Sequence, residues 1–131
     1  IDYYKQHYPD LLHISAYLGS YFYKFNVTKP PLNDKRVRRA LTMAIDREAI
    51  VTTVMRGGQL PAFNLTPPGT AGYTCRTLVH EDVAEAKRLL AEAGYPDGKG
   101  LPTIELLYNT LEAHRTATSC APLFVTRGAT E

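Results

Sequence analysis

The feature that most constrains the fold of this sequence is a run of alternating side chains that ends at a pair of prolines. Between residues 21 and 27, one side of an extended chain would carry Tyr21, Tyr23, Phe25 and Val27, and the other side Phe22, Lys24 and Asn26. A period of two with aromatic and β-branched residues is typical of a strand. Lys29-Pro30-Pro31 then stops it, because proline has no amide hydrogen to donate to a ladder. The pattern therefore predicts a strand over residues 21–27.

Two helical segments are predicted directly after this strand. Asn33 and Asp34 are good N-cap residues, and a single apolar stripe follows at helical spacing: Val37, Ala40, Leu41, Ala44 and Ile45. Asp46 can cap a second segment, which buries one side made of Ile50, Val51, Val54 and Met55. Gly57 is the natural residue for the left-handed position after that helix.

The second half of the sequence predicts a long loop, a third helix and another strand. Residues 59–77 are rich in Pro, Gly and Thr and have no sustained period, which is typical of a loop. An amphipathic stripe then spans residues 79–93, with Glu81 and Asp82 in its first turn, Arg88 and Glu92 spaced for an ion pair, and Gly94 just past its end. Residues 103–109 alternate again, and residues 11–17 could begin a further strand in which Gly19 marks a bulge or a close backbone approach. The expected class is α+β, a small mixed or antiparallel sheet flanked by about three helices.

Length and composition restrict the function classes. At 131 residues, a single domain covering 1–131 is the natural expectation. A formal charge of +2 is too weak to indicate a nucleic-acid partner, and no apolar run approaches the length of a membrane span. No signal peptide is visible, so a leader is expected to be absent or removed. Cys75 and Cys120 could pair or remain two separate thiols. No metal or cofactor motif is present, so no cofactor is expected.

Several segments in this order also carry a resemblance to a known family. They are YLGSYFYKFN (residues 17–26), KPPLNDKRVRRALTMAIDREAIV (29–51), GQLPAFNLTPPG (58–69) and AKRLLAEAGYPDGKGLPTIELLYNT (86–110). A Glu-Ala-His triplet follows at residues 112–114. Over residues 12–115 the chain resembles the family 5 solute-binding proteins of ABC importers, the oligopeptide- and dipeptide-binding class. Such proteins are several times longer, so the resemblance implies part of one periplasmic-binding-protein lobe. Residues 116–131 depart from the pattern and are expected to form a divergent tail.

The resemblance implies a function, a location and a set of ligand-facing residues. The implied function is binding of a peptide or small ligand in the periplasm or at the outer cell surface, with ABC transporter membrane subunits as partners of a full-length protein. Family members bind extended peptides through main-chain groups of strand edges. Carried over by position, the ligand-binding candidates are Tyr17, Gly19, Phe22, Lys24, Asn109 and His114. Because the opposing lobe is not part of this sequence, peptide affinity is expected to be weak, and a second copy of the chain is expected to cover the open face as a homo-oligomer.

Alternatives to ligand binding stay open at the level of the sequence. Phe22 could be a core residue, Lys24 a solvated strand position and His114 a polar residue at a helix start. The whole chain could be a self-associating interaction domain without a ligand. It could also be a small esterase-like hydrolase in which His114 activates a serine (Ser15, Ser20 or Ser119), although no GxSxG nucleophile elbow is present. We therefore assign no catalytic residue.

Overall fold

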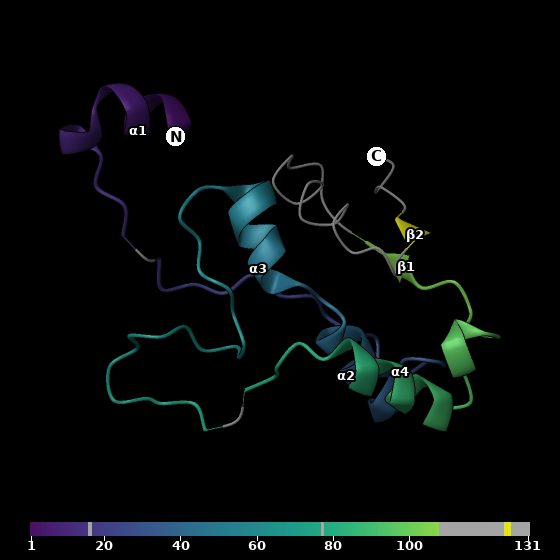
Figure 1. The fold of residues 1–131 in the computed structure, drawn as a ribbon. Helices are drawn as coiled ribbons and strands as arrows, with labels where there is room; N and C mark the ends of the chain where they lie inside the picture. Colours follow the sequence, from purple (N-terminus) through teal and green to yellow (C-terminus); the bar gives the residue numbers. More distant parts are fainter. Residues whose placement is uncertain (16, 77, 108–124, 127–131) are drawn as a thin grey trace.

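The computed structural model describes residues 1–15, 17–76, 78–107 and 125–126 of the chain (Figure 1). Its elements follow in this order: α1 (Asp2–His7), the 3-10 turn η1 (Pro9–Leu11), α2 (Lys35–Met43), α3 (Arg47–Ala49), the π-helical η2 (Ile50–Met55), α4 (Val83–Glu92), the 3-10 turn η3 (Pro96–Gly98), β1 (Glu105–Leu106) and β2 (Val125–Thr126). The regular structure of the described part is therefore mainly helical, with long irregular connections between the helices.

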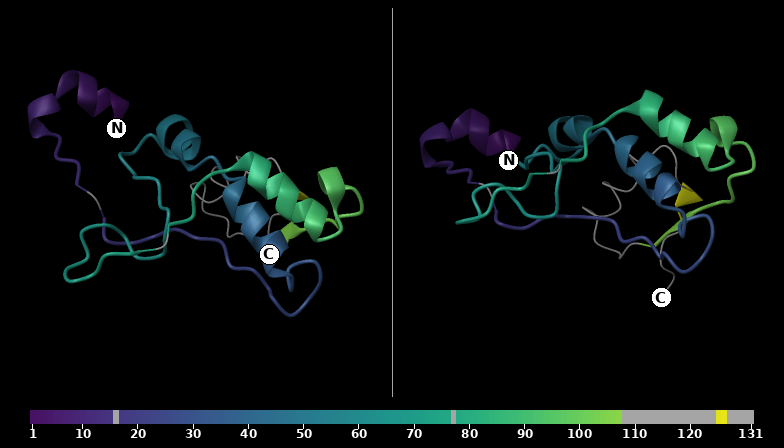
Figure 2. Two further views of the ribbon diagram at one scale, coloured as in Figure 1. Left: turned by 60° about the horizontal axis from the view of Figure 1, so that its bottom comes forward. Right: turned by 90° about the horizontal axis from the view of Figure 1, so that it is seen from below.

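The core lies between α2 and α4, which run side by side in all three ribbon views (Figures 1 and 2). The two helices run antiparallel, because the amide of Asp82 at the start of α4 donates to the carbonyl of Met43 at the end of α2, at 3.0 Å. Six buried hydrophobic side chains of the described residues lie on these two helices: Val37, Ala40, Leu41, Met43, Ala86 and Leu89. Of these, Ala40 and Met43 of α2 pack with Ala86 and Leu89 of α4 in one cluster. This core follows from the two predicted stripes, since each stripe needs an apolar partner to leave water.

Aspartates begin three of the helices, as N-cap residues do. The side chain of Asp34 accepts a hydrogen bond from the amide of Arg36 at 2.8 Å, and that of Asp46 accepts one from the amide of Ala49 at 2.7 Å. Both predicted caps are thus confirmed. Asp82, expected in the first turn of the third helix, is instead its cap and accepts from the amide of Glu85 at 2.8 Å. Each bond satisfies an amide that has no partner within its own helix.

The predicted end of the second helical segment is one residue too late. The left-handed residue is Arg56, with φ of 51°, so the prediction of Gly57 at this position is wrong. Arg56 also pairs with Asp2 at 3.1 Å, and this ion pair links the end of η2 to α1. The prediction for the other helix is right, because Gly94 follows α4 with φ of +95°.

The predicted sheet is present only as one pair of very short strands in the described residues. Glu105 of β1 pairs with Val125 of β2, and Leu106 with Thr126, in parallel register. β1 falls inside the strand predicted for residues 103–109. The mixed or antiparallel sheet flanked by helices stays a prediction beyond this parallel pair.

The prediction of a strand over residues 21–27 is corrected, because these residues are not in a strand and, within the described part of the chain, the sheet consists of β1 and β2. The same holds for residues 11–17, of which Leu11 belongs to η1 and the described remainder is irregular. A period of two shows which backbone shape suits a sequence, but a strand exists only where a second strand accepts its hydrogen bonds. The described residues supply no such partner beside this segment.

Much apolar surface stays open outside the α2–α4 core. Seventeen large apolar side chains of the described residues are exposed, whereas four large ones (Val37, Leu41, Met43 and Leu89) are buried. α1 lies at the far end of the molecule from α2 and α4 (Figure 2), and the rings of Tyr3, Tyr4, His7 and Tyr8 contact one another there. Within the described residues, each helix falls short of the length and apolar character that a membrane crossing needs.

Candidate functional site

Four of the six predicted ligand-binding residues lie on one exposed stretch, residues 17–26, which we call the open segment. It runs from the α1 end of the molecule toward α2 (Figure 1). Exposure alternates along its second half: Phe22, Lys24 and Asn26 are exposed, whereas Tyr23 and Phe25 are half-buried. Tyr21 and Val27, which the sequence places on the side of Tyr23 and Phe25, are exposed as well, so exposure follows the predicted division only over residues 22–26. Over those residues the side chains keep the period of a strand, although the described residues include no strand paired with them.

Contacts between side chains two residues apart support this extended shape. The ring of Tyr21 meets that of Tyr23 edge to face, with centroids 5.8 Å apart. On the opposite side, the Lys24 ammonium lies over the ring of Phe22, 5.7 Å from its centroid. Residues at i and i+2 share a face only when the backbone is extended. The open segment is thus shaped like a strand before any partner pairs with it.

One edge of the open segment has main-chain groups without backbone partners. Within the described part of the chain, the amides and carbonyls of Phe22 and Lys24 make no backbone–backbone hydrogen bond. In an extended chain, the main-chain groups of residues two apart point to the same edge. An edge of this kind is a template for pairing with another extended chain.

Tyr17 and Gly19 contact each other at the start of the open segment. The amide of Gly19 donates to the carbonyl of Tyr17 at 2.9 Å, and the Tyr17 side chain is 87% exposed. A β-carbon at position 19 would lie 2.2 Å from Cε1 of the Tyr17 ring, so any other residue would displace that ring. The close contact at Gly19 is thus with a side chain, whereas the sequence predicts a bulge or a close backbone approach.

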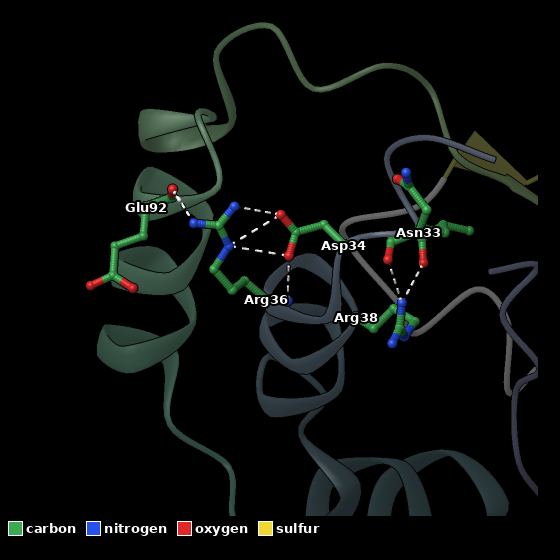
Figure 3. A network of polar contacts seen from close by, with 6 residues as sticks. Asn33, Asp34, Arg36, Arg38 and Glu92 are labelled. Carbon is green, nitrogen blue, oxygen red and sulfur yellow. Dashed lines mark hydrogen bonds and ion pairs between the residues drawn. The ribbon is translucent and has the colours of Figure 1, made fainter. Parts of the chain in front are cut away.

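A turn at residues 26–34 connects the open segment to α2. Asn26 ends the segment, since its side-chain oxygen accepts from the amide of Thr28 at 3.1 Å and from its hydroxyl at 2.7 Å. Arg38 of α2 reaches back and donates to the carbonyls of Leu32 at 2.8 Å and Asn33 at 3.0 Å (Figure 3). Helix α2 thus fixes the turn, and through the turn it fixes the direction of the open segment.

A second arginine joins α2 to α4. The guanidinium of Arg36 binds the Asp34 carboxylate, with 2.6 Å between Nη2 and Oδ2, and donates from Nη1 to the carbonyl of Glu92 at 2.7 Å (Figure 3). The hydrogen bond from Arg36 lowers the pKa of Asp34 from 3.8 to about 2. The same bond raises the pKa of Arg36. Arg36 therefore connects the N-cap of one helix to the last turn of the other, a contact between residues 56 positions apart that the sequence does not predict.

The long loop before α4 is held by Arg47. Its guanidinium lies 6.0 Å from the centroid of the Phe63 ring and donates to the carbonyls of Thr42 at 3.0 Å and Ile45 at 3.1 Å. Burial lowers the pKa of Arg47, and the charge of Glu81 opposes that shift. The amide of Val79 closes the loop on the carbonyl of Phe63 at 2.9 Å. Phe63 is thus held by both contacts, which keep this part of the loop after η2 close to Arg47 and Val79.

An apolar pocket that was not expected from the sequence lies at the α1 end. It has a volume of about 310 Å³ and is lined by Tyr4, Tyr8, Leu11 and Leu12. The spacing of Tyr4, Tyr8 and Leu11 by four and three residues is the signal that could have found it. Nothing polar among its lining residues is positioned for chemistry, so it is an apolar contact surface.

The other predicted functional residues lie outside the described part of the chain. These include Asn109 and His114, so their place at the site stays a prediction, and so does a hydrolase built on His114. Cys75 is half-buried, but Cys120 is outside the described residues, and their pairing is likewise untested. Among the described residues, no group of three or more His, Cys, Asp or Glu side chains is placed to hold a metal ion.

Comparison with known proteins identifies the family. Residues 1–120 match the model of the bacterial extracellular solute-binding proteins, family 5. The periplasmic oligopeptide-binding protein OppA of Escherichia coli K12 is 44% identical over 117 residues, which is 85% of this chain and 21% of that protein. The probable deoxycholate-binding periplasmic protein YgiS of the same organism is 43% identical over 112 residues, 81% of this chain and 21% of that protein.

A solved structure agrees with these relatives. The unliganded open form of MppA, a periplasmic murein tripeptide binding protein, superimposes with a TM-score of 0.85 at 33% identity over 99% of this chain and 28% of that one. This chain spans about a fifth of the length of the curated relatives that it matches. With a family match over most of its residues, the chain belongs to the bacterial extracellular solute-binding proteins of family 5.

Proposed function

We propose that this chain binds an extended peptide along the open segment, as part of a solute-binding lobe in the periplasm or at the outer cell surface. The observation that carries the proposal is the edge formed by Phe22 and Lys24, whose main-chain groups have no backbone partner in the described part of the chain. A peptide in the extended conformation can add to such an edge as a further strand. The alternating side chains of the segment would then face alternate side chains of the peptide.

The relatives support a peptide as the ligand class. OppA is named for oligopeptides and MppA for a murein tripeptide, whereas YgiS is named for deoxycholate. A ladder of main-chain hydrogen bonds can form with a peptide but not with a bile acid, which has no repeating amides. The open edge therefore favours a peptide over an apolar small molecule. By the same family relationship, ABC transporter membrane subunits are proposed as partners of a full-length protein.

Affinity is expected to be low. Each net hydrogen bond contributes roughly 0.5 to 1.5 kcal/mol, and association has its own cost of at least about 4 kcal/mol. A few ladder bonds on an open, hydrated edge therefore yield a dissociation constant of about 1 mM or weaker. Closure of a second lobe over the peptide would remove water and strengthen the same bonds.

A nuclear magnetic resonance titration of the isotope-labelled chain tests this function. Tri- to pentapeptides are added to several millimolar, and deoxycholate is added in a parallel series below its micellar range. We expect amide shifts concentrated on residues 17–26, with α2 and α4 unchanged, and a smaller or different response to deoxycholate. Absence of any shift, or shifts confined to the α1 pocket, would remove the proposed site.

We also infer that the chain self-associates through its exposed apolar surface. The support is the excess of exposed over buried large apolar side chains in the described residues, because monomers seldom leave such surfaces open. Light scattering over a concentration series measures the molar mass directly. A mass of 14.6 kDa at every concentration would contradict this inference without affecting peptide binding.

A further inference from the structure

Phe22 and Lys24 form a small composite surface on the exposed side of the open segment. The Phe22 ring is 52% exposed, and the Lys24 side chain is exposed as well. The ammonium lies 5.7 Å from the ring centroid. A flat apolar surface and a positive charge therefore lie next to each other, on a face of the segment where side chains of a paired peptide would lie beside them.

The charge of Lys24 is not used within the described part of the molecule. The ion pairs there involve Asp34, Asp2, Glu85 and Glu92, and each of these carboxylates is paired with an arginine. No carboxylate of the described residues lies within ion-pairing distance of the Lys24 ammonium. Its recorded contact is with the Phe22 ring, and a cation over a ring is attracted by the ring's negative face.

We infer that Lys24 and Phe22 together select peptides that bring a carboxylate to this position, either a glutamate side chain or the peptide's own C-terminal carboxylate. The inference rests on the proposed peptide-binding function and adds the chemical class of the ligand. Extended pairing places a peptide side chain opposite the exposed side of the segment. The methylene groups of a glutamate would lie on the Phe22 ring while its carboxylate meets the Lys24 ammonium.

The geometry also explains why Lys24 is suited to this task. The contact with Phe22 restricts the long lysine side chain before a ligand arrives, so less side-chain entropy remains to be lost on binding. The ammonium carries three hydrogen-bond donors and does not need the fixed fork of an arginine. The ammonium can therefore bind either kind of carboxylate, even when the two lie in slightly different positions.

The test uses the full 131-residue chain and one set of short peptides with identical backbones. The peptides are acetylated and amidated and carry Glu, Gln or Lys at one central position. A fourth peptide carries Gln and a free C-terminal carboxylate, which separates the two sources. Dissociation constants come from the amide shifts of residues 17–26. The Glu peptide is expected to bind about two- to fivefold more tightly than the Gln peptide, the range for an exposed ion pair, and the Lys peptide most weakly.

Three variants distinguish a local charge from the overall charge. Lys24→Glu should reverse the order, so that the Lys peptide binds more tightly than the Glu peptide. Lys87→Glu makes the same change of charge on an exposed position of α4 and should leave the wild-type order intact. Phe22→Ala should weaken the Glu and Gln peptides by a similar factor, because both lay methylene groups on the ring. Raising the salt to about 1 M should reduce the Glu preference, since the screening length falls to about 3 Å.

The outcomes separate this inference from the function it rests on. Equal affinity for Glu, Gln and Lys peptides overturns the selection of a carboxylate and leaves peptide binding in place. If Lys87→Glu changes the preference as much as Lys24→Glu does, the selection of a carboxylate is also overturned, because the effect would then come from net charge. Tighter binding of the amidated Glu peptide points to the side chain as the source of the carboxylate, and tighter binding of the free-acid Gln peptide points to the C-terminus. Failure of every peptide to bind overturns the proposed function and the selection together.

Discussion

Replacing Leu41 by alanine is the sharpest test of how this chain is held together. Leu41 lies on α2 and is only 1% exposed, one of the two largest fully buried side chains in the described residues. The substitution removes three carbon atoms from the core, each worth about 0.8 kcal/mol on transfer to water. The cavity that remains adds to this loss, so the expected destabilisation is about 3 to 5 kcal/mol. Alanine is the better helix former, so the loss cannot come from helix propensity.

Urea unfolding followed by far-ultraviolet circular dichroism measures this change. With a slope of about 1 to 3 kcal/mol per molar urea, a loss of about 3 kcal/mol moves the midpoint down by about 1 to 3 M. The matched control is Leu65→Ala, because Leu65 lies in the long loop and is 64% exposed. This control should change the free energy of unfolding by less than about 0.5 kcal/mol. Similar midpoints for both variants, or no shift for Leu41→Ala, would refute the burial of Leu41 as a main source of stability.

Two further predictions concern the ends of these helices. Asp34→Asn keeps a residue that can cap α2 but removes the ion pair with Arg36, which holds the pKa of Asp34 at about 2. Because the folded pKa is depressed, this stability is present above the ordinary pKa of 3.8 and is lost as the pH falls toward about 2. In urea unfolding, the variant should thus be less stable than the wild type at pH 6 and nearly equal to it at pH 2. Glu85, whose pKa is also lowered, contributes a loss of stability in acid that both proteins share. An equal difference in stability at both pH values would contradict this. Gly94→Ala should lower stability by about 1 kcal/mol in thermal unfolding, since Gly94 has φ of +95° and a β-carbon there meets nothing within 4 Å. Gly94→Asn should lose less, and equal losses would show that the backbone conformation is not the cause.

The open segment illustrates how far a pattern of residues leads and where it stops. The period of two assigns Phe22 and Lys24 to one side and Tyr23 and Phe25 to the other, and exposure divides them in the same way. The pattern cannot supply a pairing partner, because ladder bonds join segments that are distant in sequence. The prediction therefore agrees with the exposure of residues 22–26, but not with that of Tyr21 and Val27, which are both exposed. It is wrong about a paired strand within the described residues.

The helix ends also separate what a local pattern of residues predicts from what it does not predict. Caps such as Asp34 and Asp46 depend on amides two or three residues away, so their chemistry is visible in the sequence. The left-handed residue was placed at Gly57 because glycine favours that conformation, yet the chain uses Arg56. Its side chain pairs with Asp2, which no local pattern could have indicated.

The sequence by itself determined the helical stripes of α2 and α4, the two caps Asp34 and Asp46, and the separation of Phe22 and Lys24 from Tyr23 and Phe25. These properties depend on interactions within about four residues, and such neighbours meet in any helical or extended chain. Only the tertiary structure decided that Arg36 reaches the end of α4, that Arg47 holds the loop at Phe63, and that the edge of the open segment keeps unpaired main-chain groups in the described part of the chain. Each of these depends on which distant surfaces bury each other, and that is settled by the packing of α2 against α4 as a whole.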